Sequence, residues 1–183
     1  MFIKLYLWLK KHLLGIDIRK PLEIAIANGL KIGKNHNIRE EVIIDPSHCF
    51  LITIGDNVTI APRAHILAHD ASTKYHLGYT LIGRVTIGNN VFIGAGAIIM
   101  PNVSIGDNVI IGAGSVVKHS IPANSVAAGN PAIVKCSTEE YLEKRRQQMN
   151  NHPCYDDSYK ITVITPEKKE QMINEVDSIG FII

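Results

Sequence analysis

Residues 87–118 read IGNNVFIGAGAIIMPNVSIGDNVIIGAGSVVK, and an aliphatic residue recurs in them at every sixth position. The series starts earlier and is interrupted once; its members are Ile54, Ile60, Ile66, Ile87, Ile93, Ile99, Ile105, Ile111 and Val117. A helix of about 3.6 residues per turn cannot hold every sixth residue on one face over this length. The period therefore indicates short strands that are joined by regular corners.

The corners are marked by residues that stand three places after the aliphatic position. These residues are Asn57, Asn90, Gly96, Asn102, Asn108 and Gly114. Asparagine and glycine adopt φ > 0 most easily, so each six-residue unit is expected to turn a corner there. The β-branched residues between the corners favour strands that stack on equivalent strands one coil later. The predicted fold class is an all-β solenoid of hexapeptide repeats.

An earlier series keeps the same period in a different phase and is interpreted as an irregular first part of the solenoid. Its members are Ile32, Ile38, Ile44 and Phe50, and it places His36 and His48 at nominally small inward positions.

Composition limits the class of partner and the compartment. The chain has 183 residues, 46% of them hydrophobic, which is enough for one domain with a buried core. Its net charge of +2 gives no reason to expect a nucleic-acid partner. The 3 cysteines form no C-x-x-C pair, so we expect neither a disulfide framework nor a zinc knuckle. A reducing compartment, and hence a cytoplasmic location, is expected.

With its hexads and the segment VAAGNPA at residues 126–132, the chain resembles the hexapeptide-repeat acyltransferases. The resemblance covers about residues 30–136 and is strongest to sugar O-acetyltransferases of the maltose, galactoside, capsule or O-antigen type. It implies a left-handed parallel β-helix with three hexads per coil, and therefore about four coils here. It also implies a homotrimer that transfers acetyl from acetyl-CoA to a sugar or polysaccharide hydroxyl, without an acyl-enzyme.

The candidate catalytic residue lies where the hexads break, between Ile66 and Ile87, at the start of an expected loop over residues 72–84. His69 occupies the place that asparagine or glycine fills elsewhere, so one interpretation is that it only turns a corner with φ > 0. The resemblance implies instead that His69 is the general base, since an alcohol is a poor nucleophile until its proton is removed. Asp70 is the candidate to orient the imidazole, or it caps the loop.

The resemblance further implies a donor site and an acceptor site. The residues expected to contact acetyl-CoA are Phe92, Gly94, Ala95, Gly112, Ala113, Lys118, Asn130, Pro131 and Lys135. Small side chains let the pantetheine approach the backbone, and the lysines would meet phosphates. The alternatives are that the glycines only make corners and that the lysines are simply solvated. His76, Tyr79 and Phe92 are the expected acceptor contacts.

Three other functions are weighed against this one. A serine O-acetyltransferase-like activity is the nearest alternative, but the long helical N-terminal domain of those enzymes is absent. A non-catalytic scaffold is disfavoured by the histidine at the loop root. A carbonic anhydrase-like metal site from His65, His69 and His76 is disfavoured because residues 87–93 lack the His-x-x-x-x-His pair, so no metal is expected.

The solenoid, at residues 30–136, is flanked by residues 1–29, a helix and lead-in, and by residues 137–183, a helical tail. Residues 1–15 are expected to cap the open coil, or alternatively to anchor the protein on a membrane surface through Tyr6 and Trp8. The apolar run at residues 5–9 is too short to span a bilayer.

In the tail, a capping box at Ser137 predicts a helix to about Gln148. A second helix is expected from Thr165–Pro166 onward. The apolar side expected for this second helix contains Met172, Ile173, Val176 and Ile179.

Overall fold

The computed structural model describes residues 21–183, and these fall into two compact units that divide between Cys136 and Ser137. The helix expected within residues 1–15 lies outside the described residues. Among the described residues no helix is long and apolar enough to cross a bilayer.

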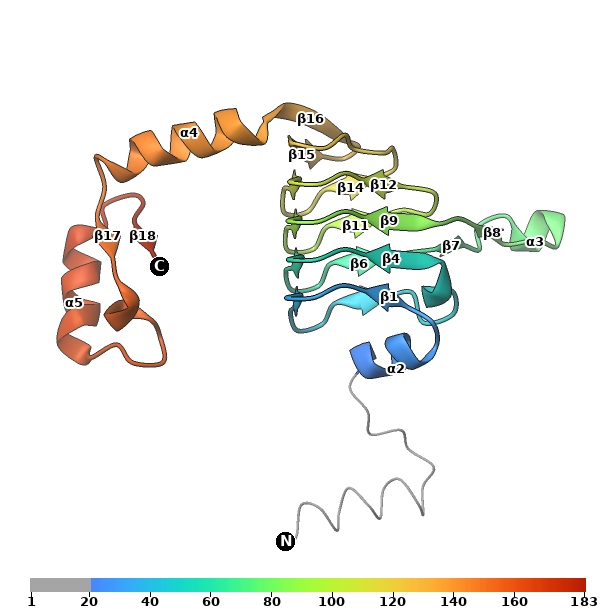
Figure 1. The fold of residues 1–183 in the computed structure, drawn as a ribbon, viewed down its shortest axis with the longest axis horizontal. Helices are drawn as coiled ribbons and strands as arrows, with labels where there is room; N and C mark the ends of the chain where they lie inside the picture. The colour runs from blue at the N-terminus through green and yellow to red at the C-terminus, as the bar shows by residue number, and fades with distance from the viewer. Residues whose placement is uncertain (1–20) are drawn as a thin grey trace, which may run out of the picture. The chain divides into compact units, whose positions relative to one another are not determined.

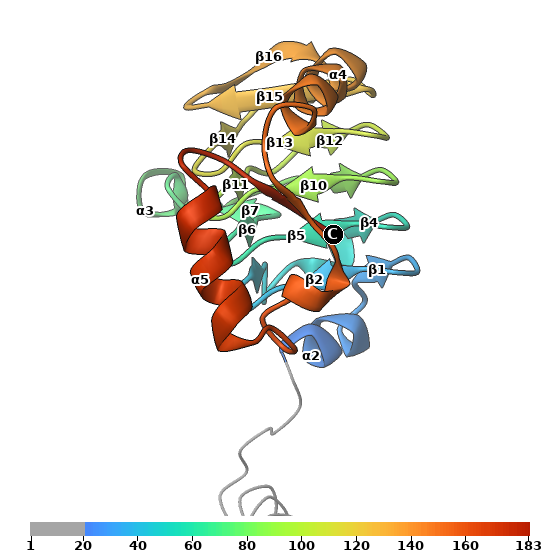
Figure 2. The same cartoon turned by 90° about the vertical axis from the view of Figure 1, so that its left-hand side faces the viewer.

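Three sheets build the first unit, and the chain visits them in turn (Figure 1). The strands of successive coils pair parallel. The first sheet contains β1 (Lys31–Ile32), β4 (Ile52–Ile54), β9 (Val85–Ile87) and β12 (Ser104–Ile105). The second contains β2 (Asn37–Ile38), β5 (Thr59–Ile60), β10 (Phe92–Ile93), β13 (Ile110–Ile111), β15 (Ser125–Gly129) and β16 (Ala132–Ser137). The third contains β3 (Ile43–Ile44), β6 (His65–Ile66), β11 (Ile98–Ile99) and β14 (Val116–Val117). Figure 2 shows the strands of the second sheet stacked above one another.

The inward aliphatic positions form the core, as the six-residue period predicts. Each is the last residue of its strand and pairs with its equivalent in the next coil, so that Ile93 lies between Ile60 and Ile111. From Ile54 to Val117 every member of the series is at most 2% exposed. The first and third sheets are four-stranded, so the described chain completes four coils, and the predicted solenoid is confirmed.

The predicted corners are confirmed by the backbone. Asn57, Asn90, Asn102 and Asn108 have φ between 55 and 64°, and Gly96 and Gly114 have φ of 66°. At the corner between the first and second sheets, asparagine side chains also form a ladder, in which Asn57 Nδ2 donates to Asn90 Oδ1 at 3.0 Å. The asparagines at this corner thus both turn the chain and link successive coils through hydrogen bonds.

Two interruptions at one corner make the early coils longer than the later ones. Successive asparagines of the ladder lie 18 positions apart from Asn90 to Asn108. The separation is 22 positions from Asn35 to Asn57 and 33 positions from Asn57 to Asn90. Both interruptions follow a strand of the third sheet. The first is residues 45–51, which we call the corner insertion, and the second is residues 69–82, which we call the finger.

The corner insertion explains why the earlier aliphatic series is in another phase. Ile32, Ile38 and Ile44 pack against the core, but Phe50 is 54% exposed, so the expectation that Phe50 continues the inward series is wrong. Phe50 lies instead in a short 3-10 helix, η1 (Cys49–Leu51), and the inward series resumes at Ile52 and Ile54.

The finger is a two-stranded hairpin that leaves the side of the coil (Figure 1). Its strands β7 (His69–Asp70) and β8 (Leu81–Ile82) pair antiparallel, and the short helix α3 (Lys74–Leu77) lies at its tip. Gly78 ends α3 with a φ of 75°. At the base, Gly83 N donates to Ala68 O at 3.0 Å, which returns the chain to the coil.

The remaining elements of the first unit lie at its ends. Helix α2 (Pro21–Ala27) leads into β1, with Ala25 and Leu30 in the core cluster. At the other end, β15 and β16 are joined through a cis peptide bond at Asn130–Pro131.

The second unit contains both helices predicted for the tail. Helix α4 (Thr138–Met149) has Ser137 as its N-cap, with the predicted capping box, and α5 (Pro166–Glu175) has Thr165 as its N-cap. The expectation that Val176 and Ile179 continue α5 is wrong, because the helix ends at Glu175 and Val176 is its C-cap. The segment between the helices contains β17 (Cys154–Tyr155), which pairs with β18 (Phe181–Ile182), and η2 (Asp157–Tyr159).

Candidate active site

The corner insertion and the finger leave the same corner of the coil on successive turns. Ile44 of β3 pairs with Ile66 of β6, so the residues that follow these two strands lie side by side. Asp45 directly follows Ile44, and His69 lies at the root of the finger just beyond Ile66. The register of the third sheet therefore brings Asp45 and His69 together, although they are 24 positions apart in the sequence.

The contact between these two side chains is short. Asp45 Oδ2 lies 2.6 Å from His69 Nδ1. The Asp45 side chain is fully buried, whereas that of His69 is 30% exposed. With Nδ1 engaged by the carboxylate, the proton on that nitrogen is held in place and Nε2 is the nitrogen left to accept a proton from another molecule.

Asp45 is held in its ionised form by four donors. Its Oδ1 accepts the N–H groups of Ser47 and His48, both at 2.9 Å, and its Oδ2 accepts Ala68 N at 2.8 Å in addition to His69. Burial alone would raise the pKa of the carboxyl. The hydrogen bonds from His69 and from the three backbone groups outweigh burial, so the pKa of Asp45 lies below its ordinary value.

The geometry decides between the interpretations left open for His69 and Asp70. His69 lies in β7 and is not among the residues with positive φ, so it does not serve to turn a corner as asparagine does elsewhere. Asp70 does not orient the imidazole, because its Oδ1 accepts Ser72 N at 2.8 Å within the finger. The hydrogen bonds from Ser72 lower the pKa of Asp70, which caps the loop, while Asp45 fills the orienting position.

A second histidine packs beside the pair. The rings of His48 and His69 have centroids 5.1 Å apart, and His48 Nδ1 is buried without a hydrogen-bond partner, 4.0 Å from Asp45 Oδ1. Asp45, His48 and His69 thus hold potential metal-ligand atoms within 4.8 Å of one another. Both oxygens of Asp45 already accept two hydrogen bonds each, so a cation there would have to displace donors. The arrangement suits proton transfer better than metal ligation.

The residues expected to bind acetyl-CoA lie on other parts of the coil. Gly94, Ala95, Gly112 and Ala113 follow β10 and β13, at the corner between the second and third sheets. A Cβ on Gly94 would lie 2.4 Å from Ala113 N, so Gly94 is also needed for the stacking of successive coils. The structural and binding interpretations of this glycine are compatible.

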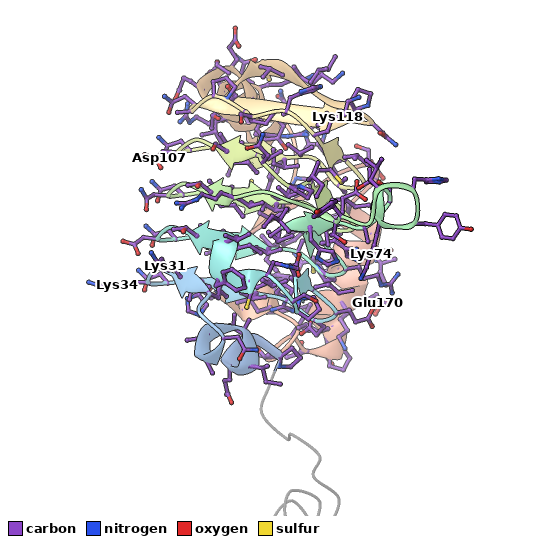
Figure 3. All side chains as sticks on the ribbon, turned by 90° about the vertical axis from the view of Figure 1, so that its right-hand side faces the viewer. Lys31, Lys34, Lys74, Asp107, Lys118 and Glu170 are labelled. Carbon is purple, nitrogen blue, oxygen red and sulfur yellow. The ribbon has the colours of Figure 1, made fainter. Side chains whose placement is uncertain are left out.

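The remaining donor candidates are distributed along the end of the coil. Lys118 follows β14, at the same corner as the finger but higher in the stack, and Figure 3 shows it above Lys74. Lys135 is exposed in β16, and Asn130 and Pro131 form the exposed turn between β15 and β16.

The expected acceptor residues are not gathered around His69 in one chain. His76 and Tyr79 are exposed in the finger, beyond its base. Phe92 lies in β10, in the sheet opposite the corner that carries His69. The site residues that the sequence did not reveal are Asp45, His48 and Phe50. The corner insertion places Asp45 and His48 next to the base, and Phe50 next to His48.

Comparison with known proteins agrees with this fold. The family model described as "Bacterial transferase hexapeptide (six repeats)" matches residues 84–119. The Protein CapG of Staphylococcus aureus is 38% identical over 145 residues, which cover 77% of this chain and 81% of that protein.

Two solved structures add to the likeness. A maltose O-acetyltransferase from Clostridium difficile 630 is 39% identical with a TM-score of 0.50, and the match covers 60% of this chain and 59% of that one. A hexapeptide-repeat acetyltransferase from Vibrio cholerae, complexed with acetyl coenzyme A, is 26% identical with a TM-score of 0.53, and the match covers 60% of each chain. The chain thus spans about three fifths of these two structures. The fold is the left-handed parallel β-helix expected from the sequence, and the chain belongs to the hexapeptide-repeat transferase family.

Proposed function

We propose that the protein is an acetyl-CoA-dependent O-acetyltransferase that acts on a hydroxyl of a sugar or polysaccharide precursor, with His69 as general base. The observation that carries the proposal is the contact between buried Asp45 and half-buried His69 at the root of the finger. The named activity of the maltose enzyme supports the acceptor class, and the acetyl coenzyme A bound to the Vibrio cholerae protein supports the donor.

The proposed reaction is a direct transfer. His69 Nε2 takes the proton of the acceptor hydroxyl while the oxygen attacks the carbonyl carbon of the acetyl thioester. The tetrahedral intermediate collapses with cleavage of the carbon–sulfur bond, so that the acetyl ester forms and the coenzyme leaves as a thiolate that regains the proton. Asp45 holds Nδ1 and stabilises the imidazolium that forms during the step.

Release of free thiol from acetyl-CoA, measured with a panel of acceptors, tests the activity. The panel contains maltose, methyl β-D-galactopyranoside, N-acetylglucosamine and L-serine. We expect sugar-dependent thiol release. Release that depends on L-serine and on none of the sugars would contradict the proposed acceptor, and no release with any acceptor would favour a scaffold.

A homotrimer is part of the proposal because one chain carries the two halves of the site on different edges. The base lies at the corner between the third and first sheets, while Gly94 and Ala113 lie at the corner between the second and third. We propose that the base of one subunit faces the donor segment of the next. Sedimentation equilibrium should then give about three times the mass of one chain.

Complementation between two inactive variants tests the shared site directly. His69→Asn removes the base, and Ala113→Trp places a bulky ring at an exposed donor position. In mixed trimers some sites combine the wild-type His69 of one variant with the wild-type Ala113 of the other, so activity should return on mixing. Persistent inactivity of verified mixed trimers would contradict a site shared between subunits.

We further propose a cytoplasmic location, which fits the three free thiols at Cys49, Cys136 and Cys154. Residues 1–15 either cap the coil or bring the protein to the inner face of the membrane. Deletion of these residues should lower the thermal stability in the first case and abolish binding to anionic vesicles in the second.

A further inference from the structure

The corner insertion holds an exposed aromatic ring on a rigid support. On one side of Phe50, Cys49 is 1% exposed and its thiol donates to Ala25 O at 3.5 Å. On the other side, Leu51 packs against the core. A Cβ on Gly29 would lie 2.9 Å from Phe50 Cβ, so the turn after α2 lies close to the base of this side chain. Phe50 nevertheless keeps 54% of its surface exposed.

The backbone that carries this exposed ring is thus held in place by the buried Cys49 and the partly buried Leu51. A large apolar ring that remains in water forgoes the free energy that burial would give. A ring that is carried by a fixed backbone also loses less conformational entropy when another molecule covers it than a ring on a mobile loop. Phe50 therefore has the properties of a preorganised contact surface.

The position of Phe50 relates that surface to the candidate base. The ring centroids of Phe50 and His48 are 5.8 Å apart, and those of His48 and His69 are 5.1 Å apart. His48 is thus near both other rings, and it connects the apolar ring of Phe50 to the imidazole held by Asp45. His48, 29% exposed, lies between them and offers a polar ring edge.

We infer that the corner insertion is the acceptor platform, and that the acceptor is a cyclic sugar whose apolar ring face lies on Phe50. The inference rests on the proposed function for the identity of the base. A pyranose ring carries C–H groups on its faces and hydroxyls around its edge, which matches an aromatic face beside a polar imidazole edge. One hydroxyl then reaches His69 Nε2, while a neighbouring hydroxyl bonds to His48. An acyclic acceptor such as serine has no comparable face.

Binding of non-reacting complexes tests the platform separately from catalysis. Calorimetric titrations use methyl β-D-galactopyranoside and maltose as probes, with the intact protein saturated with coenzyme A in place of acetyl-CoA. Phe50→Ala should weaken the affinity of the wild type's preferred pyranoside about tenfold, and Phe50→Tyr should restore it. Tyr75→Ala is the matched control, because Tyr75 is an aromatic that is 93% exposed at the finger tip.

His48→Phe tests the contribution of the His48 ring nitrogens separately from the packing of its ring. The variant keeps an aromatic ring between Phe50 and His69 and removes the ring nitrogens. It should weaken pyranoside binding by about fivefold to tenfold, and the KM for acetyl-CoA should stay unchanged.

The outcomes distinguish this inference from the proposed function. Pyranoside binding that depends on Phe50, without acetyl transfer, would support the platform and contradict the function. Acetyl transfer to pyranosides with unchanged affinity in Phe50→Ala would overturn the platform alone. Absence of pyranoside binding by the wild type would overturn the platform and would also count against a sugar acceptor. Loss of the trimer in Phe50→Ala with unchanged sugar affinity would identify Phe50 as a subunit contact and would also overturn the platform.

Discussion

Asp45 Oδ2 and His69 Nδ1 lie 2.6 Å apart, although the two residues are 24 positions apart in the chain. The contact exists because each follows a strand of the same sheet on successive coils. Asp45 has a second role, since its other oxygen accepts the N–H groups of Ser47 and His48 and so folds the corner insertion. One carboxylate thus orients the proposed base and shapes the segment that carries Phe50.

Asp45→Asn should lower kcat without a comparable change in the KM for acetyl-CoA. The amide keeps one oxygen but turns an NH2 group toward donors that need an acceptor, so His69 loses its fixed orientation. A decrease of about 10²- to 10⁴-fold is expected from steady-state kinetics. Asp70→Asn is the control and should remain near wild-type activity, because Asp70 only caps the finger. Equal losses in the two variants would contradict the orienting role of Asp45.

The same carboxylate should make the first unit sensitive to acid. The pKa of Asp45 is lowered in the folded protein, so its contribution to stability is fully present above the pKa of an unfolded aspartate, about 3.9. That contribution is lost as the pH falls from there toward the folded pKa. Urea unfolding followed by circular dichroism should show that the stability difference between wild type and Asp45→Asn shrinks below about pH 4. A difference that stays constant down to about pH 2.5 would contradict this account.

Substitution by alanine should have different effects on stability at two neighbouring glycines, Gly94 and Gly96. A Cβ on Gly94 would lie 2.4 Å from Ala113 N in the next coil, whereas a Cβ on Gly96 would meet no atom within 4 Å. Gly94→Ala should therefore cost about 3 kcal/mol of unfolding free energy through overpacking. Gly96→Ala should cost about 1 kcal/mol, because its φ of 66° strains any residue with a Cβ. Denaturant unfolding compares the two, and an equal cost would contradict the stacking role of Gly94.

If Lys118 and Lys135 meet the phosphates of acetyl-CoA, reversing both to glutamate should raise the KM for acetyl-CoA and weaken its dependence on salt. Lys34→Glu is the control, because Figure 3 shows Lys34 on the opposite edge of the coil from Lys74 and the finger. An unchanged KM in the double variant would assign both lysines to solvent.

The repeat in the sequence was sufficient to predict the coil, because a buried aliphatic residue recurs every six positions and most corners between strands carry a residue with positive φ. The prediction failed at Phe50. The inward residues Ile44 and Ile54 are ten positions apart, so a step of six from Ile44 ends at Phe50, inside the corner insertion. His69 could be located because the hexads visibly stop beside it. Its partner could not, because the contact depends on the register between coils, and that register changes with the length of each interruption.

The same reasoning accounts for the errors near His69. The sequence offers Asp70 as the nearest carboxylate, but a residue that follows His69 along β7 points away from it, because side chains alternate along a strand. Once the offset of 22 positions between the first two coils is known, Asp45 is placed opposite Leu67 and within reach of His69.

The most direct test of the central claim is the activity of His69→Asn. The asparagine amide stands close to the place of Nδ1 and keeps a donor for Asp45, while Nε2 is removed. We expect a folded trimer with unchanged coenzyme A binding and a kcat that is about 10² to 10⁴ times lower than that of the wild type. A His69→Asn enzyme with full activity would contradict the account, because no proton acceptor would then be needed at this position.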